Sequence, residues 1–161
     1  AVSDFRSPEL DILLCAECKY FVGTNSGYSV VPPLFGKRCA LTNWSPLAIP
    51  NWYPDDIYMP KLVFDRRLGR LLTFEEMYKS SSGWSQFMRD FKDPLVLKDN
   101  SPDELLEVVQ ELHREVFGGV SNSTEDDLKR RARFNQIAKD NGGYIGSQIS
   151  DAFLRRYENL L

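Results

Sequence analysis

The sequence has little histidine and cysteine, no long hydrophobic run and no surplus of positive charge. It holds one histidine and three cysteines, an odd count that favours free thiols in a reducing compartment. The formal net charge of −3 argues against a dedicated nucleic-acid-binding protein, which normally carries a basic surplus. No apolar stretch approaches the roughly 20 residues that span a bilayer. We therefore expect a cytoplasmic protein that binds no nucleic acid.

What remains is the composition of a globular protein, with 42% hydrophobic and 27% charged residues among 161. A chain of this length is expected to build one main core. We divide it into an α/β domain over residues 1–118 and a helical extension over residues 119–161.

The first half alternates between helix and strand patterns. Ser7 and Pro8 mark the start of a helix, and its apolar residues recur at helical spacing, so we expect one buried face. That face consists of Leu10, Leu13, Leu14 and Cys18. Short apolar strands are predicted at 20–22 and 38–41. Between them, a helix is expected to begin near Ser26 or Gly27, and the Pro32-Pro33 pair must kink or stop it within about two turns.

The second half adds helices with clear starting signals. Capping sequences at 73–76, 100–104 and 124–127 each predict a helix, and a last helix is expected from Ser147. The proline-rich, aromatic segment from Trp44 to Pro60 is expected to be an irregular loop, and a long aromatic loop at the end of a strand is often functional. Residues 62–64 and 69–72 read as short strands or extended loop, and 95–97 as a further strand. The alternation predicts a Rossmann-like open parallel sheet with flanking helices and a helical C-terminal tail.

The strands expected near residues 20, 38 and 95 are few for such a sheet, which usually has about 5–6. Val2 is a candidate for the last residue of an earlier strand, with Ser3 and Asp4 at its carboxyl end. We therefore expect an incomplete lobe, completed by a missing N-terminal lobe or by a partner chain.

A polar turn, Thr24-Asn25-Ser26-Gly27, follows the first predicted strand directly. In open α/β sheets, ligands bind beyond the carboxyl ends of the strands, where Ser3-Asp4 and Thr42-Asn43-Trp44 should meet this turn. Amide and hydroxyl donors there suit a phosphate group, and Gly27 would let a phosphate approach the backbone closely. The alternative is that Ser26 is only a helix cap and Asn25 only a turn residue.

The stretch "SPELDILLCAECKYFVGTNSGYS" resembles the nucleotide-sugar half of GT-B-fold glycosyltransferases, with the pattern of the fucosyltransferase superfamily. The turn "VGTNSG" is similar to the "VGxDSG" turn of bacterial heptosyltransferases. Together, "GYSVVPPLFGKRCALTNW" and "NSPDELLEVVQEL" resemble uncharacterised bacterial glycosyltransferases of surface polysaccharide synthesis, over most of Ser3 to Val116. The fucosyltransferase likeness covers only about forty residues.

This resemblance implies a binding site for a nucleoside diphosphate sugar. The residues that fall on its motifs, or close to them, are Asp4, Thr24, Asn25, Ser26, Gly27, Tyr28, Ser29, Asn43 and Trp44. The chain departs from the families in lacking both the histidine that follows the heptosyltransferase turn and the upstream basic motif of fucosyltransferases. Arg6 and Lys61 are the nearby candidates for the positive charge that a diphosphate needs.

The implied reaction transfers a hexosyl or deoxyhexosyl group to the hydroxyl of a carbohydrate or lipid-linked acceptor, without a cofactor. The families' turn neutralises charge without a metal. Contact with the inner membrane is an open alternative, because polysaccharide enzymes often use lipid-linked acceptors. Asp55 and Asp56 are candidates for the general base, against the alternative of a solvated turn. The alternative function is a non-catalytic α/β domain for binding or assembly.

The cysteines offer a second chemistry to weigh. Cys15 and Cys18, with Cys39 and His113, could be read as a Cys₃His zinc set. The first pair lies on a predicted apolar helix, where thiols usually pack as small hydrophobic groups. We expect packed thiols and no metal.

Overall fold

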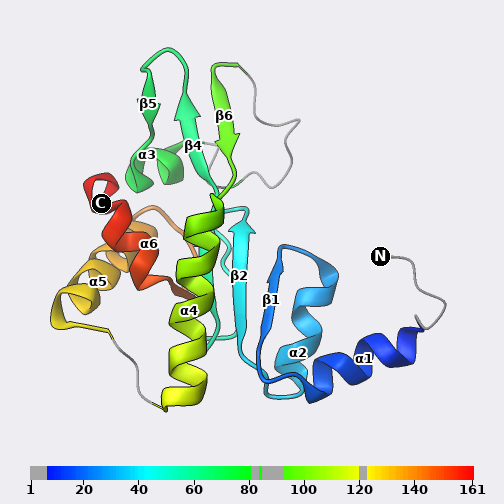
Figure 1. The fold of residues 1–161 in the computed structure, drawn as a ribbon. Helices are drawn as coiled ribbons and strands as arrows, with labels where there is room; N and C mark the ends of the chain where they lie inside the picture. The colour runs from blue at the N-terminus through cyan, green and yellow to red at the C-terminus, as the bar shows by residue number, and fades with distance from the viewer. Residues whose placement is uncertain (1–6, 81–83, 85–92, 120–122) are drawn as a thin grey trace.

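A computed structural model describes residues 7–80, 84, 93–119 and 123–161. Four parallel strands form its centre: β1 (Phe21–Thr24), β2 (Cys39–Trp44), β3 (Ile57–Pro60) and β7 (Gln148–Ile149). They lie in the order β1-β2-β3-β7, with helices packed around them (Figure 1). The predicted α/β class with an open parallel sheet is confirmed. The expectation for Val2 to Asp4 falls outside the described residues.

The connection from β1 to β2 is short and follows the predicted pattern. It consists of η1 (Gly27–Val30) and α2 (Val31–Leu34). The chain then turns at Gly36, whose φ of 69° is in the left-handed region that favours glycine. Residues 45–56 link β2 to β3 without a helix. The strand β3 lies within a proline-rich segment that the sequence led us to expect as irregular.

A second, antiparallel sheet follows β3 and extends past the carboxyl ends of β2 and β3 (Figure 1). It contains β4 (Leu62–Asp65), β5 (Arg70–Leu71) and β6 (Leu95–Lys98) in the order β5-β4-β6, and α3 (Phe74–Lys79) follows β5. Residues 95–97 are therefore a strand, but not a strand of the parallel sheet. The sequence pattern cannot tell these two placements apart, because it carries the apolar character of a strand but not the strand's partner.

The helices α4 (Pro102–Gly118) and α5 (Glu125–Asp140) begin where their capping sequences predict. They are followed by α6 (Asp151–Arg156) and the 3-10 turn η4 (Glu158–Leu160). Reciprocal capping boxes are present at Ser101 and Thr124. The predicted continuous helix from Ser147 is instead β7 followed by α6 and η4. None of the helices in the described ranges is long and apolar enough to cross a bilayer.

The core lies between the parallel sheet and the helices α4, α5 and α6. Helix α4 contributes Val108 and Leu112, both fully buried, and it packs on β2 and β3. Phe74 stacks edge-on against Phe134 with ring centroids 5.0 Å apart, and Phe153 lies 6.3 Å away. The last forty residues thus supply part of the central core and one strand of the parallel sheet.

Helix α1 (Pro8–Glu17) departs from its prediction. We expected a buried apolar face, but Leu13 is 54% exposed and Leu14 is 58% exposed. Cys15 is the residue of this helix that is buried, and α1 packs against α2 rather than on the sheet. The apolar stripe exists in the sequence, but in the described chain nothing covers it.

A buried carboxylate, Glu111 on α4, fixes the start of α6. It accepts hydrogen bonds from the Ser150 hydroxyl at 2.6 Å and from the N–H groups of Asp151 and Ala152 at 3.0 and 3.2 Å. Burial raises the pKa of Glu111, and these three donors oppose that shift. The carboxylate therefore ties two distant parts of the chain through a cap.

Replacing Glu111 with alanine should lower the free energy of unfolding by about 2–3 kcal/mol, because three buried donors would lose their acceptor. Urea unfolding of the variant measures this. Glu125→Ala, which removes an exposed carboxylate from α5, is the control and should change stability by less than about 0.5 kcal/mol. Equal effects of the two variants would contradict the capping role of Glu111.

Candidate ligand-binding groove

A groove of about 380 Å³ begins where β1 and β2 end. One wall comes from the turn after β1 and from η1, and the other from the loop 45–56. Its lining residues are Asn25, Ser26, Ser29, Val30, Trp44, Pro46, Ile49, Pro50, Asn51, Trp52 and Tyr53. The groove therefore lies at the edge of the sheet where the sequence predicts a ligand site.

On the first wall, Ser26 occupies the N-cap position of η1 in extended conformation, with φ −152° and ψ 159°. Its hydroxyl makes no capping hydrogen bond, so the view of Ser26 as only a helix cap is not supported. Ser29, in contrast, is committed to the protein: its N–H and its hydroxyl both donate to the Ser26 carbonyl, at 3.1 and 2.7 Å. A Cβ on Gly27 would meet no atom within 4 Å, so open space lies beside this backbone.

Hydrogen bonds join the ends of β1 and β2. The Asn25 side-chain amide donates to the Ser45 carbonyl, and the Thr42 hydroxyl donates to the Gly23 carbonyl at 3.1 Å. The predicted turn after β1 thus meets the end of β2, although Thr42-Asn43-Trp44 belongs to the strand itself and not to a turn after it. Asn25 thus both lines the groove and holds its two walls together.

The second wall is aromatic. Trp44 is buried and donates from Nε1 to the Ile49 carbonyl at 3.0 Å, which shapes the loop around its ring. Trp52 is 85% exposed, and Tyr53 follows it in the lining. An exposed indole beside hydroxyl and amide groups is a surface on which a flat base or a sugar ring can stack.

Asp56 anchors this wall from beneath. The residue is 1% exposed, and its carboxylate accepts from the Cys39 N–H at 2.8 Å and from the Asn51 side chain at 3.0 Å. Burial raises its pKa to about 6, while these two donors oppose the shift. Its side chain is used inside the protein and does not line the groove, so the expectation of Asp56 as a base is wrong. Asp55 does not line the groove either.

Residues 144–148 support the back of the same wall. The N–H of Ser147 donates to the Asn51 carbonyl at 2.7 Å, and the N–H of Tyr144 to the Ala48 carbonyl at 2.9 Å. A Cβ on Gly146 would lie 2.1 Å from the Asn51 oxygen. The two segments can approach this closely only because residue 146 has no side chain.

An apolar hollow of about 480 Å³ adjoins the groove. It shares Ile49, Pro50 and Trp52 with the groove, and Tyr144, Ile145 and Gly146 complete it. The Trp52 side chain therefore lines both the groove and the hollow.

Five of the predicted site residues do not line the groove or lie outside the description. Gly27 is not part of the lining, although it directly follows Ser26. Thr24 is exposed but does not line the groove. The Tyr28 hydroxyl donates to the Asp11 carbonyl at 2.5 Å, toward α1. Asn43 exchanges hydrogen bonds with Asn100, at 2.6 and 2.7 Å, and so clasps β2 to the start of α4. Asp4 lies outside the described residues.

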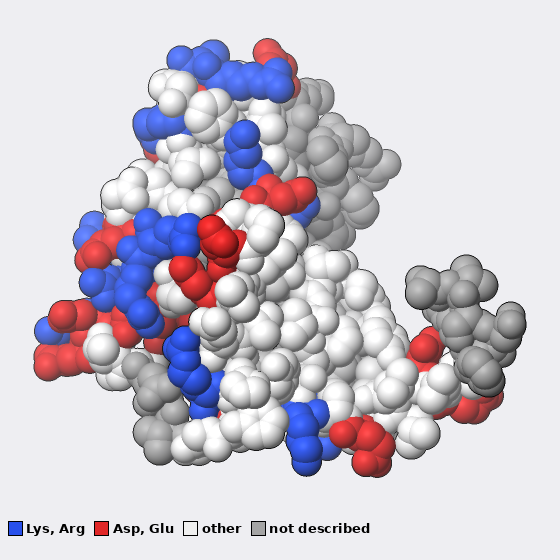
Figure 2. All heavy atoms as spheres, in the orientation of Figure 1, with Lys and Arg blue, Asp and Glu red and all other residues white. Residues whose placement is uncertain are grey.

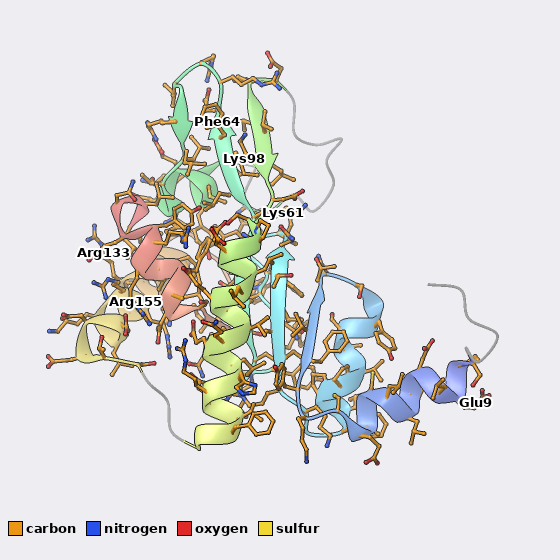
Figure 3. All side chains as sticks on the ribbon, viewed as in Figure 1. Glu9, Lys61, Phe64, Lys98, Arg133 and Arg155 are labelled. Atoms are coloured by element: carbon orange, nitrogen blue, oxygen red, sulfur yellow. The ribbon has the colours of Figure 1, made fainter. Side chains whose placement is uncertain are left out.

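The lining contains no charged side chain among the described residues. Lys61, a candidate cation, lies at the junction of the two sheets (Figure 3), and its ammonium group is 2.6 Å from Asp99. Arg6 falls outside the described residues. The lining therefore suits the uncharged parts of a ligand better than an isolated phosphate.

The three cysteines are free thiols, and no cluster of metal-ligating side chains occurs within the described ranges. The zinc interpretation of Cys15, Cys18, Cys39 and His113 gains no support from this geometry.

The fold and the groove together define a class: an α/β domain with an open groove at the carboxyl edge of a parallel sheet. Searches against protein-family models, curated proteins and solved structures give no match. Sequence reasoning singled out the aromatic loop as a whole but missed Asn51, Trp52 and Tyr53 individually. The clustering of proline and aromatic residues was the available signal.

The stability of the native protein should fall as the pH rises from about 4 to about 7, through the contribution of Asp56. The folded state binds this proton more tightly than the unfolded state, so the contribution is complete below pH 4 and is lost as the pH passes 6. Its size is at most about 3 kcal/mol. Urea unfolding of the native protein and Asp56→Asn at several pH values isolates the effect. Asp55→Asn is the control; a difference profile like that of Asp56→Asn would contradict the assignment.

Gly146→Ala should lower the free energy of unfolding by more than about 2 kcal/mol, because its methyl group would overlap the Asn51 carbonyl. Gly118→Ala is the matched control: its methyl would meet no atom within 4 Å, at the end of α4. That change should be neutral or stabilise by up to about 1 kcal/mol. Thermal unfolding compares the two, and a harmless Gly146→Ala would contradict the close approach.

Proposed function

We propose that this chain is the donor-binding part of a glycosyltransferase. It binds a nucleoside diphosphate sugar in the groove, and the sugar passes to an acceptor hydroxyl in bacterial surface polysaccharide synthesis. The observation that carries the proposal is the "VGTNSG" turn, whose Asn25 and Ser26 line an open groove at the carboxyl edge of the sheet and whose Ser26 hydroxyl makes no capping hydrogen bond. The resemblance of that turn to the diphosphate-binding turns of glycosyltransferases supports the same ligand.

Different residues of the groove contact different parts of the ligand. Ser26 and the backbone at Gly27 face the diphosphate, where hydrogen-bond donors stabilise the charge that develops as it leaves. Trp52 stacks on the base or the sugar. In the reaction, the acceptor oxygen bonds to the anomeric carbon as that carbon's bond to the diphosphate oxygen breaks. The acceptor's proton goes to a general base that is not among the described lining residues.

The adjoining apolar hollow is where we place the acceptor. It borders the donor groove through Trp52, so a bound acceptor would lie beside the sugar. Its lining of Tyr144, Ile145 and Ile49 favours an acceptor with an apolar part, such as a lipid-linked saccharide, over a free sugar.

A non-catalytic binding domain is the second candidate. The absence of any acidic or basic side chain from the described lining favours it, because displacement of a diphosphate normally uses both a base and a cation. Such a domain would bind its ligand in the same groove but turn nothing over.

The test is a titration of the protein with UDP, GDP, ADP and CMP, followed by melting temperature. One nucleotide at about 100 times its Kd should raise the melting temperature by several degrees. Ser26→Ala and Trp52→Ala should each reduce that shift, whereas Phe117→Ala, an exposed aromatic on α4, should leave it unchanged. No shift with any nucleotide would overturn the proposal. A shift without release of nucleotide from the matching sugar donor, in the presence of acceptor, would favour the non-catalytic domain.

A further inference from the structure

The strand β1 has an open side. It pairs with β2, and no other strand of the described chain lies against it. The Phe21 N–H donates toward β2, to the Arg38 carbonyl, and the Gly23 carbonyl also points that way. Because backbone groups alternate along a strand, the N–H and C=O groups of Val22 and Thr24 point to the open side. On this side of β1, the backbone N–H and C=O groups could pair with another strand.

The side chains around this edge are those of a sheet interior. Strands of a parallel sheet are normally buried on both faces, and β2 and β3 follow that rule. In β1, by contrast, Val22 is 44% exposed, and Leu34 of α2 is 71% exposed. The surface between α4 and α1 in Figure 2 is largely uncharged. An apolar segment that binds this surface would be stabilised by the removal of apolar area from water. A charged segment would find few partners for its charges there.

The position of helix α1 indicates which segment would pair with the open edge of β1. It leads directly into β1, and Figure 1 shows it lying outward of α2, past the end of the sheet. It carries Leu13 and Leu14, both more than half exposed. A helix that connects two parallel strands packs over them in a right-handed crossover. By this rule, α1 would cover a strand that precedes it and lies against β1.

We propose that β1 is an interior strand of the complete protein, and that a parallel strand of the polypeptide preceding Ser7 pairs with its open edge and is covered by Leu13 and Leu14 of α1. The open backbone of β1 requires an extended partner, the uncharged surroundings require an apolar one, and the crossover rule places it earlier in the same polypeptide. This inference does not depend on the proposed ligand.

The test uses the longest natural polypeptide that contains these 161 residues. In it, Leu14→Glu should lower the melting temperature by at least about 4 °C, because the leucine would be buried against the added strand. Leu68→Glu is the matched control: Leu68 is 53% exposed at the tip of the β4–β5 hairpin and should tolerate the change. If Leu14→Glu does not fold, Leu14→Ala gives a milder variant with the same expected direction.

Hydrogen exchange supplies an independent measurement. The amides of Val22 and Thr24 should be protected in the natural polypeptide and exchange rapidly in the 161-residue chain. Three results would overturn the proposal. One is a gene that encodes nothing before Ala1, and another is equal tolerance of Leu14→Glu and Leu68→Glu. The third is a concentration-dependent dimer of the natural polypeptide that Leu14→Glu dissociates, since that would make a second copy the occupant.

Discussion

The groove depends on one buried carboxylate. Asp56 holds the start of β2 through the Cys39 N–H and holds the loop 45–56 through the Asn51 side chain. Its own carbonyl accepts from the N–H of Gln148 at 2.8 Å, so it also sets the position of β7. A loop of twelve residues without a helix would otherwise have little to fix it on the sheet. Burying the Asp56 carboxylate costs free energy, which is why its pKa is raised. In return, the carboxylate fixes the position of the loop on the sheet.

Glu111 has a corresponding role directly after β7, where it fixes the start of α6. Each carboxylate accepts backbone N–H groups that would otherwise be buried without partners, and each joins segments far apart in sequence. Asn100 adds a third joint of this kind, because its side chain donates to the Pro60 carbonyl at 2.9 Å and pairs with Asn43. Polar side chains thus fix the edges of the sheet, while the apolar core between α4 and the strands supplies most of the stability.

Local signals made much of the fold predictable. Ser7, Thr73, Ser101 and Thr124 begin helices because capping chemistry is short-range. Pairing is not short-range, so the sequence predicts a strand at 95–97 but not its antiparallel partner, and it does not predict β3 among the prolines. In the groove, Ser26 followed from its turn, but Asn43 and Asp56 did not. Asn43 bonds with Asn100, about sixty positions away, and Asp56 bonds with Cys39, 17 positions away. Such distant partners decide whether a polar side chain faces solvent or is bonded inside the protein.

The two open features of the structure lie next to each other. The groove begins at the carboxyl end of β1, and β1 is also the strand with the unpaired edge. A parallel strand added at that edge would end beside Ser26, since parallel strands end at the same side of a sheet. Its following turn would then face the part of the groove assigned to the diphosphate. The described lining has no cation, and this is the position from which an added segment could bring one to the leaving group.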